Sequence, residues 1–114
     1  MAKEYTTPQT IKDKVTIQFA TLFLKKLIEI FKVDSYDEKR LRNLIDIIDI
    51  YMHSPSTFGW TKAFYEACDE TGLLELKKYC DALEWYQFDI FCDDISKLCI
   101  DMVVSAYIKG SEQS

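Results

Sequence analysis

The sequence predicts an all-α fold, a compact bundle of four to five helices that forms a single domain over residues 1–114. The chain has only 3 Gly and 2 Pro, too few for the many turns of a small β-sandwich or barrel. Hydrophobic residues make up 48% of it, which is enough to form a core, and they recur at helical spacing. We expect residues 1–7 and 110–114 to be frayed.

A first long helix is predicted over residues 8–32. Its apolar side chains cover nearly half of the helix circumference, which is typical of a helix that packs against more than one neighbour. They are Phe19, Ala20, Phe23, Leu24, Leu27, Ile28, Ile30 and Phe31. We therefore expect this helix to be central in the bundle.

Two further helices are predicted between residues 36 and 71. Ser35, followed three residues later by Glu38, forms a capping box that predicts a helix from the next residue on. A loop is expected at residues 53–57, because the proline there disfavours helical backbone in the residue before it. The short helix that follows should end at Gly72, which suits the left-handed position after a helix.

The last segment, residues 73–109, contains neither glycine nor proline. One apolar stripe comprises Leu73, Leu76, Cys80 and Leu83; a second comprises Phe88, Phe91, Ile95, Leu98, Cys99, Met102 and Ala106. The second stripe is rotated from the first by roughly 80° on an ideal helix. This rotation predicts a kink or short break near residues 83–88, between Leu83 and Phe88, and a long last helix after it.

The formal net charge of −5 argues against general binding to nucleic acids or anionic membranes, which needs a basic surface. The charge is uneven, at +3 over residues 1–42 and −8 over residues 43–114. This asymmetry can steer a partner with a basic surface towards the acidic part. A solvated acidic surface without a partner is the alternative.

The N-terminal residues lack the apolar stretch of a signal peptide. The longest apolar region, residues 15–33, is interrupted by four charged residues and does not have the pattern of a membrane span. We therefore expect a cytoplasmic location and no contact with a membrane.

The four cysteines are Cys68, Cys80, Cys92 and Cys99. Their spacing matches neither a zinc site nor a convincing disulfide framework, and it predicts buried free thiols. The sequence also lacks a phosphate-binding glycine-rich loop, a nucleophile elbow and a metalloprotease motif. We expect no cofactor, no metal and no enzymatic activity.

Asp46, Asp49 and His53 share one face of the predicted second helix and have residue types that can bind a divalent metal. This face lies opposite the apolar stripe, and Arg42 shares it. A solvated face with ion pairs between its residues is therefore favoured. A metal-dependent hydrolase centred on these residues is kept as an alternative.

The last helix carries the candidate partner-binding residues. Its aspartates recur at i+4 spacing and can face a basic groove, or Lys97 can bridge Asp93 and Asp101 on a solvated surface. Apolar side chains lie among these aspartates, which indicates a helix that is central in its bundle or faces a partner. The candidate residues are Tyr86, Asp89, Asp93, Asp94, Asp101, Val104, Tyr107 and Ile108.

These observations favour a small acidic helical protein-binding module that acts as a regulator, inhibitor or accessory subunit by occupying a surface on another protein. In size and helical character the chain resembles bacteriocin immunity proteins and phage-encoded inhibitors, an analogy of fold class alone. A second hypothesis is a nucleic-acid-associated accessory protein that uses the basic residues Lys12, Lys14, Lys25, Lys26, Arg40 and Arg42. A structural homodimer is a further alternative.

Overall fold

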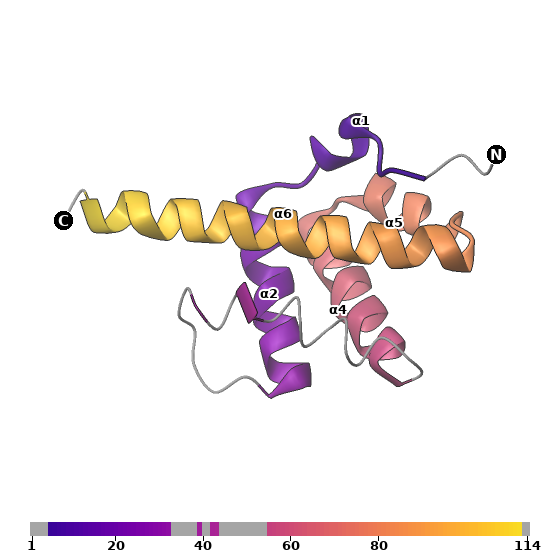
Figure 1. Cartoon of the computed structure of the whole chain (residues 1–114), viewed down its shortest axis with the longest axis horizontal. Coiled ribbons are helices and arrows are strands. Elements are labelled where there is room, and N and C mark those ends of the chain that lie inside the picture. Colours follow the sequence, from indigo (N-terminus) through magenta and orange to yellow (C-terminus); the bar gives the residue numbers. More distant parts are fainter. Residues whose placement is uncertain (1–4, 33–38, 40–41, 44–54, 113–114) are drawn as a thin grey trace.

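The computed structural model describes residues 5–32, 39, 42–43 and 55–112, with side chains up to residue 106 except those of 55–57. This part of the chain is helical and contains no strand, which confirms the all-α class (Figure 1). Its five helices are α1 (Gln9–Lys12), α2 (Ile17–Phe31), α4 (Pro55–Thr71), α5 (Leu74–Asp81) and α6 (Trp85–Glu112). The predicted helix after Ser35, and with it Asp46, Asp49 and His53, lies outside the described residues.

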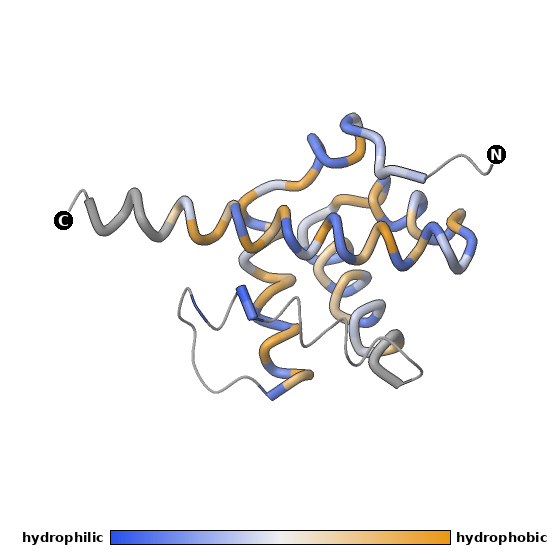
Figure 2. Tube along the Cα trace, in the orientation of Figure 1, coloured by the Kyte–Doolittle hydropathy of each residue, from blue (hydrophilic) through white to orange (hydrophobic). Residues whose placement is uncertain are grey.

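Helix α6 is the longest element and crosses α2 and α4 at a steep angle (Figure 1). Helix α2 contacts both α4 and α6, which confirms its expected central position, and α5 contacts α4. Hydrophobic residues occupy most turns of α2, whereas hydrophilic and hydrophobic residues alternate along the first half of α6 (Figure 2). The first half of α6 therefore has one side in the core and one side facing water.

Aromatic side chains from α2, α4 and α6 form the centre of the core. Phe23 of α2 packs edge-to-face on Trp60 of α4, with ring centroids 5.3 Å apart, and Trp60 stacks on Phe64 at 5.1 Å. Phe91 of α6 lies 5.5 Å from Phe64. Because all four of these rings are fully buried, they contribute most of the hydrophobic stabilisation at the point where the three helices meet.

The first predicted helix is broken, which corrects the expectation of one helix over residues 8–32. Helix α1 ends at Lys12, and α2 begins after Thr16, whose Oγ1 accepts a hydrogen bond from the backbone N–H of Phe19 at 3.1 Å. This contact is a side-chain N-cap, and it satisfies a donor that has no partner within the helix. Helix α2 ends at Lys32, which adopts the left-handed conformation with φ 55°.

Helix α4 begins at Pro55, so the predicted loop over residues 53–57 is wrong from Pro55 onward. Proline is well suited to the first position of a helix, because its fixed φ is helical and its missing N–H would have no partner there. The helix ends at Thr71, and Gly72 follows with φ +76°. The predicted end at Gly72 is therefore confirmed.

The break before the last helix is confirmed and lies at residues 82–84, between α5 and α6. The side-chain Oε1 of Gln87 accepts a hydrogen bond from the backbone N–H of Glu84 at 3.0 Å. This is the returning half of a capping box, with Gln87 in the first turn of the helix. It explains why α6 begins at Trp85 instead of continuing from α5.

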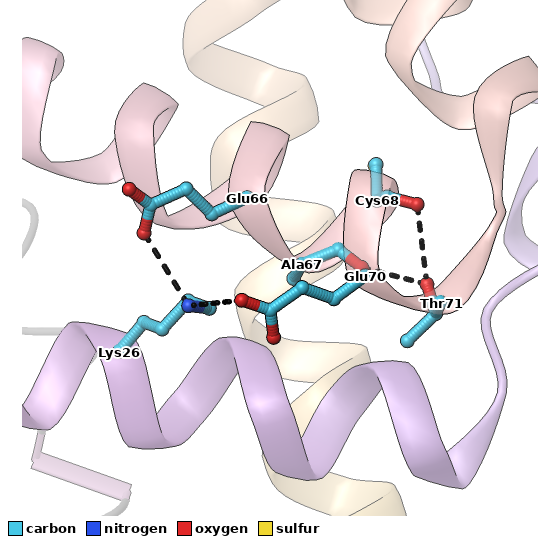
Figure 3. A network of polar contacts seen from close by, with 6 residues as sticks. All are labelled: Lys26, Glu66, Ala67, Cys68, Glu70 and Thr71. Carbon is cyan, nitrogen blue, oxygen red and sulfur yellow. Dashed lines mark hydrogen bonds and ion pairs between the residues drawn. The ribbon is translucent and has the colours of Figure 1, made fainter.

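An ion-pair cluster joins α2 to α4 (Figure 3). Lys26 Nζ reaches between two carboxylates of α4, at 3.3 Å from Glu66 and 3.2 Å from Glu70. The hydrogen bond with Glu70 is the main reason that the pKa of Lys26 is raised, although partial burial opposes it. The cluster fixes the register of α2 against α4.

Both chain ends have residues that contact the rest of the chain or belong to a helix, where the structure describes them. The Tyr5 hydroxyl hydrogen-bonds with the Tyr79 hydroxyl, and Thr7 is buried. At the other end, α6 continues through Gly110 to Glu112. The expected fraying of residues 1–7 and 110–114 remains a prediction.

Candidate protein-binding surface

The environment of α6 changes along its length. In its first half, one side is buried through Phe91, Cys92 and Ile95, and the opposite side is open. Further along, Ile100, Val103 and Val104 are buried, on a side of the helix that is rotated from the side of Phe91 and Ile95. The buried side therefore shifts around the helix, and the side that is open in the first half is covered at Val104.

This outer side carries large exposed side chains. Trp85 is 78% exposed, Tyr86 47% and Ile90 36%. Their positions, together with Asp89 and Asp93, follow an i, i+1, i+4, i+5, i+8 pattern, which places all five on one side of a helix. We call Trp85, Tyr86, Asp89, Ile90 and Asp93 the aromatic–acidic face.

The two aromatic rings of this face contact each other. The centroids of Trp85 and Tyr86 lie 5.9 Å apart in a T-shaped arrangement, a geometry in which the positive edge of one ring meets the negative face of the other. Trp85 nevertheless remains largely in water, and Tyr86 is about half exposed. A contiguous exposed group of this size is typical of a binding surface, whereas single exposed apolar residues are common on any protein.

The charges of α6 are only partly neutralised within the chain. Asp93 pairs with Lys97 at 2.9 Å, and Asp101 pairs with Arg42 at 3.1 Å. Asp89 is exposed and makes no hydrogen bond or ion pair with any residue that the structure describes. Asp89 is therefore the carboxylate of this face that is most available to a partner.

The structure brings together three of the predicted site residues, namely Tyr86, Asp89 and Asp93. Asp101 lies two turns further along α6 and is engaged by Arg42. Asp94 points to another side of the helix. Burial is the main cause that raises the pKa of Tyr5, followed by the contact with Tyr79, and the charge of Asp94 adds a smaller contribution. These two aspartates therefore do not belong to the face.

Val104 is a core residue with 3% of its surface exposed, so its assignment to the partner surface is corrected. The sequence placed it on the side of α6 that should be polar, and the helix is enclosed on that side at this point. The side chains of Tyr107 and Ile108 lie outside the described residues. Trp85 was missing from the predicted set, although its position next to the predicted kink and four residues before Asp89 is a usable signal.

A hollow lies between the turn that precedes α2 and the start of α5. Its volume is about 360 Å³, and its walls include Thr16, Gly72 and Leu76. Lys14 and Glu75, which also line it, form an ion pair at 2.6 Å. The hydrogen bond from Lys14 is the main reason that the pKa of Glu75 is lowered. These two charges neutralise each other, so the hollow offers a ligand fewer unpaired groups than the aromatic–acidic face does.

All four cysteines are free and buried, as predicted. Burial is the main cause that raises the pKa of Cys68 and of Cys80 to about 12, and it raises the pKa values of Cys92 and Cys99 further. Thiols of this kind are protonated at neutral pH and react poorly. Among the residues that the structure describes, no group of His, Cys, Asp and Glu side chains is arranged to hold a metal.

Three cations of the predicted basic region already have partners. Lys14 pairs with Glu75, Lys26 with Glu66 and Glu70, and Arg42 with Asp101. Each pair places a carboxylate where a nucleic-acid phosphate would have to bind. These contacts weaken the basic footprint that a nucleic-acid interface needs.

Comparisons with protein-family models, with curated proteins and with solved structures find no match to this chain. In the part of the chain that the structure describes, no helix is both long enough and apolar enough to cross a bilayer. The surface chemistry of the described residues is therefore the basis on which a function is proposed.

Proposed function

We propose that this chain is a protein-binding module, a small helical regulator, inhibitor or accessory subunit that occupies a surface on another protein through the aromatic–acidic face of α6. The observation that carries the proposal is the exposure of Trp85, at 78%, beside the exposed Tyr86 and Ile90. Tryptophan and tyrosine are enriched among the residues that dominate binding energy in protein interfaces.

The apolar residues of this face, Trp85, Tyr86 and Ile90, have the composition of the centre of an interface. A typical partner buries about 800 Å² on each side, whereas the aromatic–acidic face comprises only five residues. Its two aromatic rings and Ile90 would form the desolvated centre, and surrounding polar residues would form the rim. The helix supports this role, because it sets the backbone positions of these residues before the partner arrives.

A partner of another kind fits this face better than a second copy of the chain. In a two-fold symmetric dimer the same patch meets itself, which would bring Asp89 and Asp93 close to the same pair of aspartates on the second copy. Like charges that face each other across an interface are unfavourable. The homodimer hypothesis is tested directly by light scattering on the purified protein.

The nucleic-acid and hydrolase hypotheses receive less support from the described residues. The nucleic-acid hypothesis depends on cations of which several are paired with carboxylates. A mobility shift at low salt tests it, and a shift that disappears with added salt would favour it. The hydrolase hypothesis depends on Asp46, Asp49 and His53, which lie outside the described residues, and metal analysis with an Asp49→Ala control tests it.

The proposal is tested by capturing a partner from the native cells, reconstituting the complex from two purified proteins and measuring its Kd by calorimetry. We expect Trp85→Ala to weaken the complex at least about 30-fold, because truncation of a central aromatic residue commonly removes about 2 kcal/mol or more. Phe58→Ala is the matched control, since Phe58 of α4 is an aromatic residue that is 79% exposed and outside the face. Equal affinities for the two variants would contradict the proposal.

A further inference from the structure

The chain contains an aromatic–acidic pair that holds a cation. Tyr65 and Asp69 lie four residues apart on α4, so their side chains are neighbours on the helix surface. Lys77 of α5 contacts both. Its Nζ is 5.5 Å from the centroid of the Tyr65 ring and 3.1 Å from a carboxylate oxygen of Asp69. The lysine is thus bound by the face of a π-system and by a negative charge together.

Helix α6 repeats this arrangement at its exposed end. Trp85 and Asp89 are also four residues apart, with the aromatic residue first and the aspartate one turn later. Trp85 is 78% exposed, and no cation of the described residues is paired with Asp89. The pair on α6 therefore has the same constituents as the pair on α4, without the cation.

We propose that Trp85 and Asp89 form a binding site for an arginine side chain of the partner protein, an inference that rests on the proposed function. Indole is the best aromatic group for binding a cation. A guanidinium group can stack flat on it while donating two parallel hydrogen bonds to a carboxylate one turn away. A lysine ammonium, in contrast, is a compact and strongly hydrated point charge, so it gains less from the flat ring.

The rest of the face defines what lies beside this arginine. Tyr86 and Ile90 form a second pair with i+4 spacing, adjacent to the first, and both are apolar and exposed. The partner segment should therefore present a large aliphatic side chain next to the arginine. Charge agrees with this assignment, because residues 85–106 contain four aspartates and one lysine, and a basic segment is electrostatically complementary to them.

The test uses a synthetic amphipathic peptide of about 14 residues, in which arginine and leucine recur on one helical face. Matched peptides carry lysine, glutamine or glutamate at the arginine positions. Binding to the full chain is measured at low ionic strength by calorimetry and by tryptophan fluorescence. The emission of Trp85 should shift on binding, whereas Trp60 is fully buried and should not respond.

We expect the arginine peptide to bind at least about tenfold more tightly than the glutamine peptide and about threefold more tightly than the lysine peptide. Trp85→Leu keeps an apolar side chain but removes the π-system, and Asp89→Asn keeps the shape but removes the charge. Each substitution should lower the affinity for the arginine peptide about fivefold and leave the affinity for the glutamine peptide unchanged. Glu29→Gln is the control for net charge, since Glu29 is exposed on α2.

The arginine site is wrong if the glutamine or glutamate peptide binds as tightly as the arginine peptide, or if Asp89→Asn has no effect on the arginine peptide. If the lysine peptide binds as tightly as the arginine peptide, the site does not select arginine and the proposed stacking of a guanidinium group is contradicted. A result that contradicts the arginine site can be distinguished from a result that contradicts the proposed function. A natural complex that is lost with Trp85→Ala but unaffected by Asp89→Asn would keep the partner surface and remove the arginine site.

Discussion

The indole Nε1 of Trp60 donates a hydrogen bond to Oγ of Ser96 at 3.0 Å, and both side chains are buried. The bond joins α4 to α6 at the middle of the core. Because Ser96 lies on the inner side of α6, the bond also fixes the rotation of this helix about its own axis. The aromatic–acidic face is consequently held towards solvent.

Ser96→Ala should destabilise the protein by about 1–3 kcal/mol, because it leaves the buried indole N–H without an acceptor. Urea unfolding measures this change. Ser105→Ala is the control, since Ser105 is exposed on the same helix and should change the free energy of unfolding by less than about 0.5 kcal/mol. Equal stability of the two variants would show that the indole finds another partner.

The contact of Lys77 with Tyr65 and Asp69 can be tested by measuring the free energy of unfolding. Lys77→Met keeps the length of the side chain but removes its charge, and should lower the free energy of unfolding by about 1 kcal/mol. Lys78→Met is the matched control, because Lys78 is the exposed neighbour on α5. An equal decrease in the free energy of unfolding in both variants would show that the contacts of Lys77 with Tyr65 and Asp69 do not stabilise the protein specifically.

Val104→Glu distinguishes a core residue from a surface residue. Because Val104 is 3% exposed, a carboxylate there would be buried without a partner, and we expect loss of at least about 3 kcal/mol or complete unfolding. Ala106→Glu, at an exposed position two residues further on, should leave the circular dichroism and melting temperature nearly unchanged. A folded Val104→Glu protein with altered self-association would instead place Val104 on an interface.

Alkaline pH should destabilise the protein through its buried thiols. Burial is the main cause that raises the pKa of Cys68 and of Cys80 from 9.0 to about 12. Between pH 9 and pH 12 the unfolded chain loses thiol protons that the folded chain keeps. The stabilisation from these thiols is therefore fully present below about pH 9 and decreases as the pH rises towards 12. Each such thiol contributes a decrease of about 1.4 kcal/mol per pH unit. The raised pKa of Lys26 acts in the same direction.

Urea unfolding at a series of pH values from about 8 to about 11 measures this slope. In Cys80→Ala the slope should be smaller by about 1.4 kcal/mol per pH unit, whatever the effect of the substitution on stability at neutral pH. The wild-type protein at neutral pH is the reference state. A slope that does not change would show that Cys80 ionises equally in the folded and unfolded chains.

The helices that the sequence predicted correctly are those with local signals. Gly72 ends α4, and the rotated apolar stripe revealed the break before α6. The break between α1 and α2 was hidden because Ile11, Val15 and Phe19 follow one another at i+4 spacing. The apolar period therefore continues through a turn that Thr16 caps.

The site was predicted only in part, because burial along α6 depends on contacts between helices. Ile90 and Val104 lie on the same side of an ideal helix, yet Ile90 is 36% exposed and Val104 is 3% exposed. Periodicity identifies the side of a helix but not which stretch of that side is covered by other elements. For the same reason the sequence could name the aspartates of α6 without showing that Arg42 engages Asp101.

The most direct test of the partner surface is hydroxyl-radical footprinting of the purified chain with and without its captured partner. Trp85 and Phe58 are 78% and 79% exposed, so both should be oxidised readily in the free protein. In the complex we expect the oxidation of Trp85 and Tyr86 to fall at least about fivefold, because the centre of an interface excludes water, while Phe58 is unaffected. Oxidation of Trp85 at its free rate in a fully formed complex would contradict the assignment of the aromatic–acidic face.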